Sequence, residues 1–247
     1  MDEVTTSRGG LRRFVPRMWG EWARFVSRPV LPVAQQRFDA RAMGEVGQLL
    51  ALTVAIDMVL VVGLSWLATR LGIKTPEFEE LRQFGPVVTM AAGAFGLPIL
   101  EEILFRGWLT GRRRMLVGVA ALMGAVLMLF ATRGIGGPRQ HYAVMAAVLI
   151  GWLVTGAVLA WRSRGGAPAW FGRAFPALYF ASALLFGLAH ISNYDLARPL
   201  LLLPFVVPQT IAGLIFGFAR VRYGMWANIA LHATSNALFL GLSLAGM

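Results

Sequence analysis

The chain contains 247 residues, of which 57% are hydrophobic and only 14% are charged. This composition is far more apolar than that of a soluble domain of the same length, so we expect a single membrane domain. The net charge of +11 comes almost entirely from arginine, and in a membrane protein such an excess marks cytoplasmic loops more often than a nucleic-acid-binding surface. The absence of cysteine excludes disulfides, thiolate catalysis and cysteine-ligated zinc.

The first 45 residues form a basic segment that precedes the predicted transmembrane domain, residues 46–247. This segment contains no apolar core, so no cleavable signal peptide is expected. Residues 8–28 repeat apolar side chains at helical spacing with arginines between them, which predicts an amphipathic helix on the anionic cytoplasmic leaflet. The alternative is an arm that binds a partner or presents a substrate.

Seven apolar segments then follow, each of which we expect to cross the bilayer. The sequence therefore predicts an all-α, polytopic transmembrane helical bundle. Pro98 is expected to kink the second segment just before a pair of glutamates, and Asp57 lies in the first segment without an obvious partner. The predicted spans are 48–69, 86–111, 115–132, 142–161, 175–191, 199–219 and 224–245.

The distribution of positive charge predicts the orientation of these spans. If successive loops alternate between the two sides, 17 of the 23 Lys and Arg residues fall on the side of the N-terminus. Cytoplasmic loops carry such an excess of Lys and Arg. We therefore expect an integral protein, of the inner membrane in a bacterium, with a cytoplasmic N-terminus and an outward C-terminus.

The first polar cluster within an apolar segment contains Glu101, Glu102 and Arg106. Glu102 and Arg106 are four residues apart with the carboxylate on the N-terminal side, which favours an ion pair along one helix. Glu101 is then left without a helical partner and could act as a general base toward water. The alternative is that all three residues form only a buried ionic brace.

Two further clusters bring imidazoles and an amide into apolar helices. Phe186 and His190 are four residues apart and share a helix face, as do His232 and Asn236. His190 could assist a general base, whereas the N–H groups of His232 and Asn236 could hold a carbonyl oxygen as it becomes an oxyanion. The alternatives are a histidine that is only hydrogen-bonded to a neighbour and an interhelical polar clamp.

The three clusters are expected to lie at similar depths. At 1.5 Å per residue, Glu101 lies about 17 Å from the nearest arginine-rich loop and His232 about 15 Å, while His190 lies up to about 25 Å away. Convergence in one cavity that opens to the cytoplasm is therefore predicted.

These residues resemble the CPBP family, the CAAX proteases and bacteriocin-processing enzymes. The EExxxR motif of that family corresponds to Glu101–Arg106, its FxxxH motif to Phe186–His190 and its HxxxN motif to His232–Asn236. The resemblance implies a metal-independent intramembrane glutamate protease that uses no cofactor. In it Glu101 and His190 would activate water, and His232 and Asn236 would stabilise the oxyanion. Glu102, Arg106 and Phe186 would be supporting residues.

The spacing of the motifs departs from the family pattern. Glu101 and His190 lie farther apart than the family's first two motifs usually do. We interpret residues 115–161 as an inserted helical hairpin that leaves and returns on the cytoplasmic side, which preserves the topology but raises the question of how a substrate gains access.

Three other interpretations stay open at this point. Glu101, His190 and His232 could instead bind zinc with a water in the fourth position. The protein could be a non-catalytic membrane scaffold or an immunity protein. A transporter is less favoured, because no pair of broken half-helices in matching halves is found. For a protease, the expected substrates are membrane proteins or peptides, including lipidated tails and C-terminal sorting signals.

Overall fold

A computed structural model describes residues 16–73, 83–132, 139–194 and 199–245. All regular structure in these residues is helical, which confirms the predicted all-α class. Besides α-helices there are a π-helical segment, η2, and two 3-10 segments, η3 and η4. In chain order the elements are α1 (Arg17–Ser27), α2 (Ala40–Leu71), α4 (Pro86–Met90), η2 (Ala91–Gly96), α5 (Leu97–Arg106), α6 (Arg113–Ala131), α7 (Arg139–Arg162), α8 (Ala169–Ala189), η3 (His190–Asn193), η4 (Pro199–Val206), α9 (Val207–Arg222) and α10 (Met225–Leu244).

Five helical stretches of the described residues are long and apolar enough to cross a membrane. Helices α6 and α10 coincide with two further predicted spans but are not among these five, so the number of seven spans stays a prediction. The five stretches are Ala40–Leu71, Pro86–Arg106, Tyr142–Arg162, Ala169–Asn193 and Pro199–Arg222.

Local capping explains where α2 begins and ends. The carboxylate of Asp39 accepts a hydrogen bond of 2.7 Å from the amide of Ala42, so the helix begins well before residue 48, where the first span was expected. It ends at Gly72, whose φ of 66° is a left-handed conformation that glycine adopts without steric penalty. The helix therefore extends beyond the predicted span at its N-terminal end.

The second predicted span is interrupted one turn before the glutamates. Its α-helical hydrogen bonding changes to π-helical over η2 and returns to α-helical at Leu97. Pro98 has no amide hydrogen to donate to the preceding turn, so the irregularity lies just before it. The kink at Pro98 stays a prediction, and the structure shows a π-helical segment just before this residue.

Helices α8 and α9 pack closely along a run of small residues. A Cβ atom built on Gly213 would lie 3.1 Å from the Cα atom of Ala183, and one on Gly217 would lie 3.0 Å from the ring of Tyr179. Close backbone approach of this kind is what small residues at four-residue spacing allow in membrane helices. The tight contact fixes α8 relative to α9.

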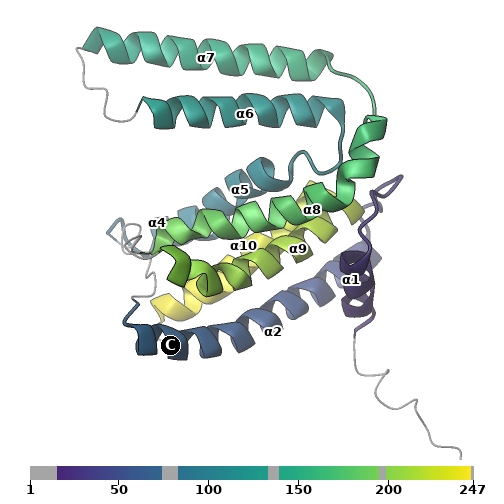
Figure 1. Ribbon diagram of the computed structural model, residues 1–247, viewed down its shortest axis with the longest axis vertical. Coiled ribbons are helices and arrows are strands. Elements are labelled where there is room, and N and C mark those ends of the chain that lie inside the picture. Colours follow the sequence, from purple (N-terminus) through teal and green to yellow (C-terminus); the bar gives the residue numbers. More distant parts are fainter. Residues whose placement is uncertain (1–15, 74–82, 133–138, 195–198, 246–247) are drawn as a thin grey trace, which may run out of the picture.

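Helix α10 has a central position in the main bundle. It packs against η2 and α5 on one side and against α9 and α2 on the other (Figure 1). Polar residues on its inward face therefore meet the helix that carries the glutamate pair.

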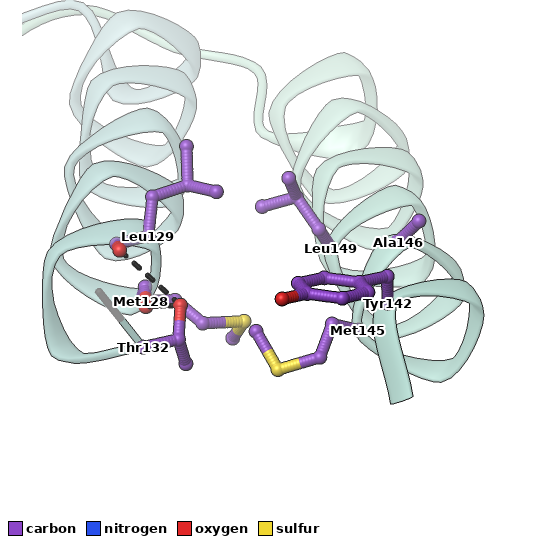
Figure 2. Close-up of a pocket in the computed structure, with 7 residues that line it drawn as sticks. All are labelled: Met128, Leu129, Thr132, Tyr142, Met145, Ala146 and Leu149. Atoms are coloured by element: carbon purple, nitrogen blue, oxygen red, sulfur yellow. Dashed lines mark hydrogen bonds between the residues drawn. The ribbon is translucent and has the colours of Figure 1, made fainter. Parts of the chain in front are cut away.

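Helices α6 and α7 form a hairpin that packs mainly on itself, at one side of the bundle (Figure 1). A cavity of about 280 Å³ lies between the two helices. Figure 2 shows that its lining is mainly apolar, with Met128, Tyr142 and Leu149 on facing sides. None of the glutamates or histidines of the predicted site lines it.

Helix α1 crosses one end of the bundle, roughly perpendicular to the long helices (Figure 1). The connections from α5 to α6 and from α7 to α8 lie at the same end (Figure 1). Within the segment predicted to be an amphipathic helix, a helix is present from Arg17, and residues 8–15 lie outside the described part of the chain. The placement of this helix on the cytoplasmic leaflet stays a prediction.

Candidate active site

Glu102 is fully buried, and donors from two helices hold its carboxylate. Oε1 accepts hydrogen bonds from Arg106 Nη1 at 2.7 Å and from His232 Nδ1 at 2.9 Å. Oε2 accepts a hydrogen bond of 2.5 Å from the amide nitrogen of Asn228. The Glu102–Arg106 ion pair has the four-residue spacing from which the sequence predicted it. With both oxygens occupied and no exposure, Glu102 has no access to a water molecule.

Arg106 is also fully buried, and its guanidinium packs on an aromatic ring. The guanidinium carbon lies 3.7 Å from the centre of the Phe186 ring, which gives a cation–π contact in a dehydrated setting. Its Nε and Nη2 atoms have no hydrogen-bond partner among the described residues. The EExxxR and FxxxH motifs are thus in direct contact.

Side chains from α8 and α9 fix the C-terminal end of α5. The hydroxyl of Ser182 donates to the Phe105 carbonyl at 2.8 Å. Arg220 donates from Nε to the Arg106 carbonyl at 3.1 Å and from Nη2 to the Gly107 carbonyl at 2.9 Å. The Arg106 carbonyl also accepts from the amide of Leu109 at 3.1 Å, so these side chains add to the hydrogen bonding at the helix end. Hydrogen bonds to two neighbouring helices therefore fix the position of the C-terminal end of α5 relative to α8 and α9.

Glu101 has a different environment from Glu102. Its side chain is 30% exposed, and its Oε2 atom lies 3.6 Å from His232 Nε2. The two ring nitrogens of His232 therefore face the two adjacent glutamates, Nδ1 toward Glu102 and Nε2 toward Glu101. Glu101 keeps the freedom to bind a water molecule.

His190 lies where α8 passes into the 3-10 segment η3. Its Nδ1 atom is 2.7 Å from the carbonyl oxygen of Phe186, and a carbonyl can only accept, so Nδ1 carries the hydrogen. In a neutral ring, Nε2 is then left as an acceptor. The Phe186 ring contacts both imidazoles, with centroid distances of 4.6 Å to His190 and 5.5 Å to His232. His190 also interacts electrostatically with Glu101.

Asn236 lies one turn beyond His232 and faces the π-helical segment. Its amide nitrogen donates to the carbonyl of Gly93 at 3.0 Å. A side-chain amide has two N–H bonds, so one remains for another acceptor. The structure therefore gathers Glu101, Glu102, Arg106, Phe186, His190 and His232, with Asn236 at the edge of this group.

Sequence reasoning missed Asn228, Ser182 and Arg220. Asn228 precedes His232 by one helical turn, so the four-residue spacing that linked His232 to Asn236 could have included it. Nothing in the sequence pairs Ser182 or Arg220 with α5, because those contacts join segments far apart in the chain. Asp57, which the sequence places within the first span, forms no hydrogen bond or ion pair with any residue of the described ranges.

The described residues contain no group of three His, Asp or Glu side chains arranged to hold a metal ion. Glu101, His190 and His232, the ligand set of the zinc interpretation, do not form such a group. The zinc interpretation therefore gains no support from the arrangement of these side chains.

Membrane-length apolar helices around a cluster of glutamates, histidines and an arginine define a membrane-embedded protein with a polar site. A comparison with protein-family models identifies the family. The model of the type II CAAX prenyl endopeptidase Rce1-like family matches residues 83–238, from just before α4 into α10. The match covers more than half of the chain and all three motifs, so the chain belongs to this family of membrane proteases.

Family membership confirms the resemblance to CAAX proteases drawn from the motifs. Together with the apolar helices it shows an integral membrane protein of a hydrolase family, whose substrates are membrane-associated proteins. No curated protein and no solved structure matches the chain significantly.

Proposed function

We propose that this protein is an intramembrane endopeptidase in which Glu101 and His190 activate water and His232 and Asn236 stabilise the oxyanion. One observation carries the proposal: two adjacent glutamates have opposite environments. Glu102 is buried and saturated by three donors, whereas Glu101 is partly exposed and faces an imidazole. Separate environments of this kind are how two carboxylates in one site take different roles.

The first step is the attack of water on the peptide carbonyl carbon. Glu101 accepts a proton from the water, and His190 Nε2 accepts its second hydrogen in a hydrogen bond and so orients it. The new C–O bond forms as the carbonyl π electrons move to oxygen. Proton transfer from a positioned water is general-base catalysis, which contributes about 10²–10⁴-fold in rate.

The negative charge on the oxygen then needs hydrogen-bond donors. Nδ1 of His232 donates to the Glu102 carboxylate, and in the proposed step the ring carries a second hydrogen on Nε2. A protonated ring donates from Nε2, and Asn236 donates the N–H that Gly93 does not use. These two donors form the proposed oxyanion hole.

The intermediate collapses when Glu101 returns its proton to the amine nitrogen. The C–N bond breaks, the carbonyl re-forms, and the products are a carboxylic acid and an amine. Atoms and charges balance with water as the only co-reactant. Glu102, Arg106 and Phe186 take no part in these steps but hold His232 and α5 in position.

The proposed location is the inner membrane of a bacterium, with the N-terminus in the cytoplasm. The support is the collection of arginine-rich connections at the end of the bundle that α1 crosses (Figure 1). Residues 46–247 form the proposed protease domain, in which the α6–α7 hairpin is an insertion. The proposed substrates are membrane proteins or peptides that carry a lipidated tail or a C-terminal sorting signal, in line with the family's activity on prenylated CAAX proteins.

The test compares the termini of membrane proteins in cells that carry the wild-type protein and in cells that carry only Glu101→Gln. The proposal expects new termini that depend on Glu101. A synthetic peptide that spans such a terminus is then incubated with purified protein in nanodiscs, with and without a strong zinc chelator. Cleavage by Glu101→Gln at the wild-type rate would contradict the assigned base, and loss of wild-type cleavage with the chelator would favour zinc.

A further inference from the structure

The apolar face of α1 is already covered by the protein itself. Met18 is fully buried, and the indole N–H of Trp19 donates to the Gln48 carbonyl at 2.7 Å. Phe25 packs on the rings of Tyr179 and Phe218, with centroid distances of 5.2 and 5.0 Å. The side chains that the sequence assigns to the bilayer are therefore used to attach α1 to α2, α8 and α9.

The opposite side of α1 and the linker after it carry unpaired positive charge. Arg24, Arg28 and Arg37 are exposed, and their guanidinium groups form no ion pair or hydrogen bond with any residue in the described ranges. Three carboxylates lie nearby, and each has another partner. Glu21 pairs with Arg222 at 2.8 Å, the buried Glu45 pairs with Arg17 and Arg41, and Asp39 accepts a hydrogen bond from the amide of Ala42.

The same linker exposes large apolar side chains. Val33 is fully exposed, and Val30 and Phe38 are about two thirds exposed (63% and 65%). These residues immediately precede α2, the first membrane-length helix. Apolar side chains beside unpaired arginines, at the start of a membrane helix, match the composition of surfaces that enter the lipid headgroup layer.

The linker is held in place at the end of the bundle. Gln35 donates from its side chain to the Arg220 carbonyl at 2.9 Å, and the amide of Gln36 donates to the Arg222 carbonyl at 2.7 Å. The linker, with its exposed arginines and valines, therefore lies beside the C-terminal end of α9.

We propose that this linker surface binds anionic phospholipid headgroups. The linker surface is defined here as Arg24, Arg28, Val30, Val33, Arg37 and Phe38. The arginines bind the phosphates, and Val33 and Phe38 enter the boundary with the acyl chains. Lipid is the occupant because the charge is uncompensated and the surface continues directly into a membrane-length helix. This inference does not depend on the proposed protease activity.

The first test uses the absence of cysteine from the chain. Val33→Cys carries a single spin label in nanodiscs of equimolar phosphatidylglycerol and phosphatidylcholine. Collision rates with oxygen and with a water-soluble nickel chelate report its depth. We expect the label on Val33→Cys to collide more often with oxygen. The control label on Gly166→Cys, in the exposed connection from α7 to α8, should collide more often with the nickel chelate. If the label at residue 33 collides with the nickel chelate as often as the label at residue 166 does, the proposal is wrong.

The second test measures how much the arginine charges contribute to lipid binding. Purified protein in neutral detergent is titrated with short-chain phosphatidylglycerol or phosphatidylcholine, and the unfolding temperature reports binding. Each arginine near an anionic surface contributes about fivefold in affinity, so Arg24→Gln, Arg28→Gln and Arg37→Gln together should weaken the phosphatidylglycerol response at least tenfold. The matched control variant loses the same amount of positive charge and should keep most of the phosphatidylglycerol response in unfolding temperature. It carries Arg70→Gln, Arg162→Gln and Arg164→Gln.

Two results would overturn the proposal. One is an equal response in the two triple variants. The other is protection of a label at residue 33 by an acidic peptide but not by phosphatidylglycerol, which would assign the surface to an acidic protein partner instead.

Discussion

The main bundle and the α6–α7 hairpin differ sharply in how much of their surface is covered by protein. In the four membrane-length stretches of the bundle, between 17% and 50% of an apolar 18-residue segment is buried, compared with 6% of such a segment in α7. Both regions consist of apolar helices, yet every residue of the candidate site lies in the bundle. In this chain, apolarity therefore identifies the membrane helices, whereas burial identifies the helices that position polar groups.

The largest expected effect concerns Glu101, at the polar centre of the bundle. Glu101→Gln removes the proposed base and keeps the side-chain shape, so turnover should fall by about 10²–10⁴-fold. Peptide cleavage in nanodiscs measures this. Because the Glu101 side chain is partly exposed, the unfolding temperature should remain that of the wild type. Unfolding at a lower temperature would mean that Glu101 is a structural residue.

A second large effect is expected at Glu102, this time on stability. Glu102→Gln leaves the Arg106 charge buried without its partner, and breaking a buried pair in this way costs about 3–5 kcal/mol. Thermal or denaturant unfolding in detergent measures it. The double variant Glu102→Leu with Arg106→Met removes both charges and should recover part of the stability but none of the activity. No difference in stability between Glu102→Gln and the wild type would contradict the buried pair.

Asn236 should show an effect on rate that is smaller than that of Glu101. Asn236→Ala removes one proposed oxyanion donor, which lowers turnover by about 10²–10³-fold. Its loss should reduce kcat rather than raise KM, because the oxyanion exists only in the transition state and the intermediate. A change in kcat of less than threefold would exclude Asn236 from this role.

The smallest effects compare two glycines in the two regions. A methyl group on Gly213 would meet Ala183 and lie 2.9 Å from Arg106 Nη2, so Gly213→Ala should destabilise by about 1–3 kcal/mol. Gly151 of α7 has open space around the same position, so Gly151→Ala should leave stability unchanged or raise it slightly. Equal destabilisation by the two substitutions would remove the distinction between bundle and hairpin.

Contacts within one helix were predictable from the sequence, whereas contacts between helices were predictable only as an approach of side chains at similar depth. The four-residue spacing predicted the Glu102–Arg106 pair, and depth predicted that His232 could approach the glutamates. The donors from Asn228 and Arg220 were missed, because helix rotation and crossing geometry decide which side chains meet and neither can be read from one chain. The π-helical segment was missed for a related reason, since Pro98 indicates an irregularity but does not determine its form.

Arg220 faces two parts of the molecule at once. Its carbonyl accepts a hydrogen bond from the side chain of Gln35 in the linker. Its guanidinium donates to the carbonyls at the C-terminal end of α5. The linker that we propose binds headgroups and the helix with the glutamates thus share one anchor. A bilayer thinner or thicker than the helices would tilt them about this anchor. Turnover should therefore vary with acyl-chain length, so hydrophobic mismatch becomes a means of controlling the rate.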